Sequence, residues 1–246
     1  MLVHLSYFSE PLGKQAAMHV IVPQKPGRHP LIVQLHGYSD DYTIWQRRTT
    51  IELEAERIGA AVAMLDGGLS FYTDAADGTG DWEKHILFST ELVERTFGVG
   101  GSRARRAIGG LSMGGYGAMK IGLKHADRFG SVVSHSGVLD IGHWYGECKR
   151  PKQMQRIFGA RPKASEDPVR LLATAKPLPR LWIDCGSEDF LIEHNRRFQR
   201  LLTRRGVRHE YREYPGSHNW GYWQARLPES FDHHAAWFAG HRAKAQ

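Results

Sequence analysis

A serine between glycines gives the sharpest chemical signal in this sequence. The segment GLSMG at 110–114 has the G-x-S-x-G spacing of a nucleophile elbow, with a strand-like run before it and a helix-like run after it. Such a turn lifts the Oγ atom of Ser112 above the sheet edge, and side chains at Gly110 and Gly114 would collide with neighbouring elements. It also places the Met113 N–H at the start of a helix, where a developing oxyanion is stabilised.

A serine nucleophile of this kind needs an acid and a base, which follow it in the chain order serine, acid, histidine. Of the 14 histidines, His218 alone combines a strand end, a loop and the last position. The loop after the strand-like run at 181–185 offers Glu188 and Asp189, and we take Asp189 as the acid. Asp184 lies within the strand pattern, where a structural role is expected. The acid would hold the imidazole tautomer and stabilise the imidazolium.

A second oxyanion donor is expected from the loop after an early strand. The sequence His36-Gly37-Tyr38 occupies that place, directly after the strand-like run at 31–35. Gly37 would let the backbone approach a substrate, and the Tyr38 N–H is the expected donor. His36 and Gly37 are therefore also candidates for substrate contact.

Strand-like runs alternate with helical patterns along the whole chain. Strands are expected at 15–23, 31–35, 61–65, 107–111, 131–135, 181–185 and 209–214, and helices at 44–58, 81–97, 113–125, 192–204 and from about 228 onward. This alternation predicts an α/β fold with a mostly parallel sheet covered by helices on both faces. We expect one domain over 1–246, the N-terminal pair of strands as an antiparallel edge, and Asp81 as the N-cap of its helix.

The stretch Ile141–Lys176 lacks a clear period and is too long for a simple connection, so we expect a partial cap or an active-site loop. Its start should lie close to Ser112, because loops gather beyond the carboxyl ends of parallel strands. Trp144 and Tyr145 are candidates for the pocket wall, although packing onto the domain explains them equally well. Further candidates are Trp220 and the segment Phe71-Tyr72.

Composition and charge exclude several classes of function. The net charge is +7, but the basic residues are scattered, so nucleic-acid binding is not expected. No apolar run approaches the length of a membrane span, and the start lacks the features of a signal peptide, which predicts a cytoplasmic protein outside the membrane. Cys148 and Cys185 lack zinc-site spacing, and the adjacent His233 and His234 would face apart on a helix. No metal or cofactor is therefore predicted.

Taken together, these motifs resemble the esterase D family, a branch of the α/β hydrolases. The matching segments are LHGYSDDYTIW (35–45), LDGGLSFYTD (65–74), GGLSMGGYGAMKIGLKHADRFGSVVSHSG (109–137), DCGSEDFLIEHN (184–195) and YPGSHNWGYW (214–223). The resemblance implies the α/β-hydrolase fold, and it assigns the acid of a CGxxD pattern to Asp189 and the base of a GxHxW pattern to His218. Ser217 stands where many relatives carry glycine.

The resemblance implies a serine carboxylesterase that acts on short-chain acyl esters, a class of small-molecule substrate. The family also includes S-formylglutathione hydrolases, feruloyl and acetylxylan esterases, and mycolyltransferases, so a thioesterase, a carbohydrate esterase and an acyltransferase stay open. The compact length and the DGG-x-S-x-Y segment are most similar to the tributyrin-type esterases. A non-catalytic binding module is disfavoured by the complete serine, acid and histidine set. A homo-oligomer is also left open.

Overall fold

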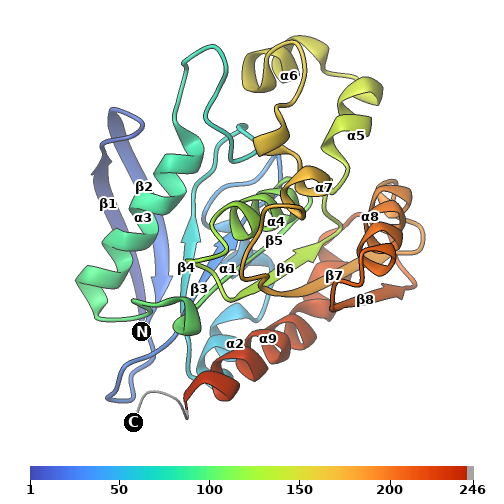
Figure 1. Ribbon diagram of the computed structural model, residues 1–246. Helices are drawn as coiled ribbons and strands as arrows, with labels where there is room; N and C mark the ends of the chain where they lie inside the picture. Colours follow the sequence, from blue (N-terminus) through green and yellow to red (C-terminus); the bar gives the residue numbers. More distant parts are fainter. Residues whose placement is uncertain (243–246) are drawn as a thin grey trace.

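Eight strands form one sheet in the order β1-β2-β4-β3-β5-β6-β7-β8 in the computed structural model, which describes residues 1–242 (Figure 1). The strands are β1 (Leu2–Ser9), β2 (Lys14–Ile21), β3 (Leu31–Leu35), β4 (Ala61–Leu65), β5 (Arg106–Leu111), β6 (Ser131–His135), β7 (Arg180–Gly186) and β8 (His209–Tyr214). From β4 to β8 the strands run parallel, and β1 and β2 add an antiparallel edge. The predicted, mostly parallel sheet is confirmed.

Burial explains which strands lie inside the sheet. Every residue of β3, β4 and β6 is buried, as expected for parallel strands covered on both faces. In contrast, β1 alternates exposed and partly buried residues along most of its length, which is the pattern of an edge strand. The predicted bounds of these three strands, 31–35, 61–65 and 131–135, agree with the structure.

Helices cover both faces of the sheet, as predicted. One face carries α3 (Trp82–Phe97), α4 (Met113–Lys124) and α8 (Ile192–Arg204), and the other carries α1 (Ile44–Arg48), α2 (Ile51–Ile58) and α9 (Trp220–Arg242) (Figure 1). A short 3-10 helix, η1 (Arg103–Arg105), leads into β5. The sheet therefore buries two separate apolar cores, one on each face.

The antiparallel edge differs from the prediction. It consists of β1 and β2, whereas β3 lies inside the sheet and runs parallel to both β4 and β5. The sequence analysis missed β1, although the alternation of Val3, Leu5 and Tyr7 with His4 and Ser6 is the pattern of a half-buried strand.

The predicted helix at 44–58 is in fact two helices. Thr49 takes an extended conformation, and its hydroxyl donates to the Trp45 carbonyl. The Thr50 N–H donates to the Gln224 side chain at 2.8 Å, so a contact with α9 helps to end α1 here. The break depends on a residue far along the chain, which explains why a local pattern does not reveal it.

Two helix starts also differ from expectation. The helix α9 begins at Trp220, before Pro228, because the Asn219 side chain accepts the Tyr222 N–H at 3.1 Å. The side chain of Asp81 makes no capping bond to α3. Asp74 provides the cap instead, since its Oδ1 atom accepts the N–H groups of Glu83 and Lys84 in the first turn of this helix.

The segment 141–176, expected to be irregular, is largely helical. It contains α5 (Ile141–Glu147), α6 (Pro151–Phe158), the 3-10 helix η2 (Ala164–Glu166) and α7 (Pro168–Leu171). These helices have at most eight residues each, so the segment as a whole shows no continuous period. The helices α5 and α6 lie beyond the carboxyl ends of the parallel strands, at the top of Figure 1. Among residues 1–242, no helix is long and apolar enough to cross a membrane.

Candidate active site

Ser112 occupies the sharp turn between β5 and α4, as predicted for a nucleophile elbow. Its backbone has φ 54° and ψ −115°, a strained conformation that costs on the order of 1–3 kcal/mol. A Cβ atom on Gly110 would lie 2.5 Å from the Gly114 carbonyl oxygen, and one on Gly114 would lie 2.5 Å from the Leu35 oxygen. Both positions therefore require glycine, as the sequence analysis expected. The turn is held by a 2.9 Å hydrogen bond from the Ser112 N–H to the His135 carbonyl.

The three residues of the predicted triad lie in one chain of contacts. The Nε2 atom of His218 lies 3.0 Å from Ser112 Oγ, and its Nδ1 atom lies 2.8 Å and 3.0 Å from the two Asp189 carboxylate oxygens. Asp189 is buried and also accepts the Leu191 N–H at 2.8 Å. Glu188, the alternative acid, is exposed to solvent. The arrangement has the distances needed for proton transfer from serine to histidine.

Backbone contacts between two loops hold the acid next to the base. The Ser187 N–H donates to the Tyr214 carbonyl at 2.8 Å, and the Glu188 N–H donates to the Gly216 carbonyl at 2.9 Å. The loops approach so closely that a Cβ atom on Gly186 would lie 2.2 Å from the Gly216 oxygen. The loop after β7 and the loop after β8 therefore form one unit that carries both Asp189 and His218.

The predicted oxyanion loop lies directly against the nucleophile. A Cβ atom on Gly37 would lie 3.9 Å from the Ser112 Cβ atom and 2.7 Å from a Leu111 methyl group. Gly37, Tyr38 and Met113 all line the pocket above Ser112. Met113 is the first residue of α4, where the helix dipole favours negative charge.

His36 does not have the expected place among the substrate contacts. It is fully buried beneath the oxyanion loop, where Nδ1 lies 2.7 Å from the Gly37 carbonyl and Nε2 accepts the Gly67 N–H at 2.8 Å. A residue directly after a strand, such as His36, can either bind substrate or support the loop, and the sequence does not distinguish these two roles. The side chain supports the loop from below and is shielded from the pocket.

A pocket of about 840 Å³ opens above Ser112, and several aromatic side chains form part of its wall. Trp144, Trp220 and Phe71, all candidates from the sequence analysis, line it, whereas the candidate Tyr72 is fully buried and is not part of the lining. Tyr145 instead packs inside the insertion, because its hydroxyl donates to the Gly159 carbonyl at 2.7 Å and its ring meets Phe158.

The sequence analysis missed Phe190, which is 71% exposed although it lies beside the triad. Its ring centroid lies 4.5 Å from that of His218, and the Trp223 ring meets the same imidazole at 4.9 Å and 88°. Phe190 directly follows Asp189 in the sequence, and this position could have indicated that it lies near His218. Two aromatic rings thus pack against the imidazole of His218.

Comparisons with known proteins agree with this geometry. Residues 9–234 match the model of the family described as "Putative esterase". The chain belongs to this esterase family. It is 28% identical to an acetyl esterase of Caldicellulosiruptor saccharolyticus, over 94% of this chain and 97% of that protein.

Two solved structures from Staphylococcus aureus are similar to this esterase over most of its length. FphF, a fluorophosphonate-binding serine hydrolase, is 28% identical with a TM-score of 0.88, and the match covers 94% of this chain and 97% of that chain. The S-formylglutathione hydrolase FrmB is 29% identical with a TM-score of 0.85 and the same coverage. These findings confirm the α/β-hydrolase fold and the resemblance to the esterase D family.

The esterase family is a family of serine hydrolases that act on small-molecule esters. Within residues 1–242, no group of three or more histidine, cysteine, aspartate or glutamate side chains is arranged to hold a metal ion. Cys148 is partly exposed and Cys185 is buried, and both are free thiols. His233 and His234 are buried and contact Glu210 and Ser131 respectively.

Proposed function

We propose that this esterase is a carboxylesterase that hydrolyses short-chain acyl esters through a covalent acyl-Ser112 intermediate. The observation that carries the proposal is the unbroken contact chain from Ser112 through His218 to the buried Asp189, with Ser112 and His218 lining the pocket. A serine beside a histidine that is oriented by a buried carboxylate is the arrangement that activates an alcohol as a nucleophile.

The first half of the reaction transfers the acyl group to the enzyme. His218 Nε2 takes the proton of Ser112 Oγ while Oγ attacks the ester carbonyl carbon, and the carbonyl oxygen becomes an oxyanion. The N–H groups of Tyr38 and Met113 are the proposed donors to that oxyanion. The intermediate then collapses, the bond to the leaving oxygen breaks, and His218 protonates the alcohol that departs.

The second half repeats these steps with water. His218 removes a proton from water, the resulting hydroxide attacks the acyl-Ser112 carbonyl, and the bond to Oγ breaks as His218 returns its proton to the serine. Asp189 stays ionised throughout and stabilises the imidazolium that forms in each half. The products are one carboxylic acid and one alcohol for each ester and water consumed.

The pocket divides into two sides around Ser112. The leaving alcohol must lie near His218, because this residue protonates it, so we assign the alcohol to the side lined by Phe190 and Trp220. Phe71, Trp144 and Tyr38 form a separate ring cluster, and we assign the acyl chain to that side. The segment 141–176 would then act as a partial cap within a single domain over 1–246, of which 243–246 lie outside the described residues.

A thioester substrate is the second candidate, because FrmB, an S-formylglutathione hydrolase, is similar over most of the chain. Lys149 and Arg150 lie at the pocket and are exposed, so they could pair with the carboxylates of a glutathione moiety. The chemistry at Ser112 would be the same for both kinds of substrate. The cytoplasmic location and the homo-oligomer stay predictions.

A substrate panel tests the proposal directly. We expect kcat/KM to be highest for p-nitrophenyl esters of two to six carbons, with S-formylglutathione, methyl ferulate and acetylated xylan each at least about tenfold lower. Initial rates with each substrate, at one pH and one enzyme concentration, provide the measurement. A higher kcat/KM for S-formylglutathione would establish the thioesterase instead, and no turnover of any ester would refute the proposal.

Trp144 should help to select the acyl chain. We expect Trp144→Ala to change the ratio of kcat/KM between p-nitrophenyl acetate and octanoate by roughly tenfold, as ~1–2 kcal/mol of differential contact would produce. The matched control is Tyr145→Ala on the same helix, because Tyr145 packs within the insertion. The control should lose thermal stability and keep the ratio. An unchanged ratio in Trp144→Ala would show that Trp144 serves packing alone.

A further inference from the structure

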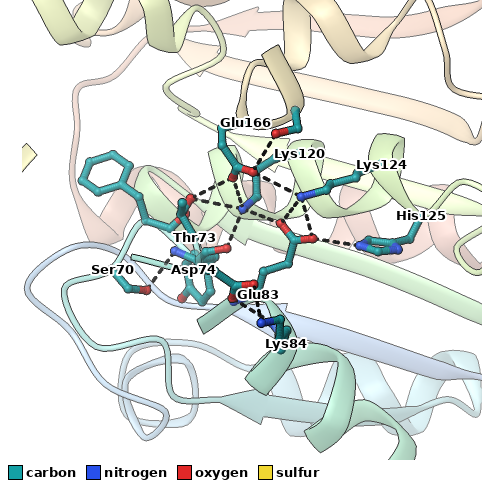
Figure 2. A network of polar contacts seen from close by, with 12 residues as sticks. Ser70, Thr73, Asp74, Glu83, Lys84, Lys120, Lys124, His125 and Glu166 are labelled. Atoms are coloured by element: carbon teal, nitrogen blue, oxygen red, sulfur yellow. Dashed lines mark hydrogen bonds and ion pairs between the residues drawn. The ribbon is translucent and has the colours of Figure 1, made fainter. Parts of the chain in front are cut away.

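A lysine is fully buried on the helix that begins at the nucleophile. Lys120 lies two turns into α4, and its Nζ atom lies 2.8 Å from Glu83 and 2.9 Å from Glu166 (Figure 2). Lys124 bridges the same two carboxylates at 3.0 Å and 3.1 Å, one turn further along the helix. The cluster connects α4 to the first turn of α3 and to η2 of the insertion.

The charges of this cluster compensate one another. Burial by itself raises the pKa of the Glu83 carboxyl, but Lys120, His125 and Lys124 outweigh it and hold that pKa well below its ordinary value. Burial likewise opposes ionisation of Glu166, and Lys120 with Lys124 still keeps its pKa low. Both carboxylates are therefore charged at neutral pH. A buried ammonium needs such partners, because an unpaired one would be very costly.

Lys120 also holds a piece of backbone that Lys124 does not contact. Its Nζ atom donates to the Tyr72 carbonyl at 2.6 Å and to the Thr73 hydroxyl at 3.1 Å. At this turn Phe71 and Tyr72 both have φ 53°, a left-handed conformation that residues other than glycine rarely adopt. The Thr73 hydroxyl in turn donates to the Phe71 carbonyl at 3.0 Å. The carbonyl groups of these two strained residues thus each accept a hydrogen bond from a side chain, Thr73 for Phe71 and Lys120 for Tyr72.

The ring of Tyr72 is also closely packed by its neighbours. A Cβ atom on Gly67 would lie 2.1 Å from this ring, and one on Gly117 of α4 would lie 2.4 Å from it. The Tyr72 hydroxyl donates to the His36 carbonyl at 2.9 Å, directly before the oxyanion loop. The turn therefore connects α4, through Gly117 and Lys120, with the loop that precedes Tyr38.

This turn presents Phe71 to the substrate pocket. The Phe71 ring lies 5.0 Å from Trp144 and 5.8 Å from Tyr38, and its N–H contacts Met113 Sδ at 3.3 Å. Phe71 lines the pocket on the side that we assign to the acyl chain. Phe71 itself has φ 53°, so its ring is carried by the same turn that Lys120 holds.

We propose that Lys120 is a positioning residue for acyl-chain selection. Its ammonium holds the Phe71–Thr73 turn through the Tyr72 carbonyl and ties this turn to Glu166 of the insertion. Phe71 is thereby fixed as the wall that limits the length of the acyl chain. This inference rests on the proposed esterase function and deepens it, since it explains why a buried charge lies on the helix that carries the nucleophile.

Lys124 provides a matched control for the test. Lys120→Met removes the contacts to the turn, whereas Lys124→Met removes ion pairs to the same two glutamates and leaves the turn untouched. We expect Lys120→Met to raise kcat/KM for p-nitrophenyl octanoate relative to acetate by about tenfold, and Lys124→Met to change this ratio less than about twofold. A fluorophosphonate probe counts active enzyme and so gives kcat/KM for each variant, and the ratio itself does not depend on the amount of folded protein.

A second pair of variants covers the case in which Lys120→Met does not fold. The double variant Lys120→Met/Glu166→Gln keeps the Lys124–Glu83 ion pair and leaves no excess charge, and Glu166→Gln alone is its reference. We expect the ratio to shift in the double variant relative to that reference. An equal ratio in both would overturn the positioning role. Absence of ester hydrolysis by the wild-type enzyme would instead refute the proposed function.

Discussion

Replacing Ser112 by alanine should remove nearly all ester hydrolysis while the fold stays intact. Without Oγ no acyl-enzyme forms, and loss of a triad nucleophile lowers kcat by on the order of 10⁴–10⁶-fold. Alanine keeps the Cβ atom and the backbone conformation of φ 54°, so the strain at the elbow is unchanged. The thermal midpoint should therefore stay within roughly 2 °C of the wild-type value.

The measurement combines kinetics with labelling. Hydrolysis of p-nitrophenyl acetate gives kcat, and intact mass after treatment with a fluorophosphonate shows whether the nucleophile is present. Ser39→Ala is the matched control, because Ser39 lines the same pocket and is exposed. This control should keep both activity and labelling. If Ser112→Ala retained half of the wild-type kcat, or were still labelled, the nucleophile would lie elsewhere.

The contacts that join Ser112, His218 and Asp189 could be predicted from the sequence because each residue follows a strand of the parallel sheet. The elbow requires glycine within two residues on each side of Ser112, where a Cβ atom would touch backbone at about 2.5 Å. Asp189 and His218 follow strands whose carboxyl ends meet at one sheet edge, so their order along the chain is enough to bring them together.

Other features depend on contacts that no local pattern contains. From the sequence alone, a lysine on a helix such as Lys120 is expected to be exposed to solvent. Lys120 is buried because Glu83 and Glu166, from two distant segments, pair with its ammonium group. Trp144 and Tyr145 are neighbours with similar side chains, yet only Trp144 lines the pocket. The rotation of the short helix α5 decides this difference, and packing of the insertion sets that rotation.

Replacing the acid that contacts His218 offers the sharpest test of the contact chain, because one of two neighbouring carboxylates is buried and the other is exposed to solvent. Asp189 is 2% exposed and contacts His218 Nδ1, whereas Glu188 is exposed and reaches this region through its backbone N–H. We expect Asp189→Asn to lower kcat by about 10⁴-fold and Glu188→Gln to lower it less than about twofold. Kinetics with p-nitrophenyl acetate at neutral pH measure both effects.

The size of the first effect follows from the geometry at His218. In Asp189→Asn the amide oxygen can still accept the Leu191 N–H, so the amide nitrogen faces Nδ1 and donates to it. The imidazole proton then resides on Nε2, which lies 3.0 Å from Ser112 Oγ and can no longer accept the serine proton. Because the substituted side chain still bonds to the Leu191 N–H and to His218 Nδ1, the free energy of unfolding should fall little while catalysis is lost. A large loss in Glu188→Gln together with a small loss in Asp189→Asn would assign the acid to Glu188.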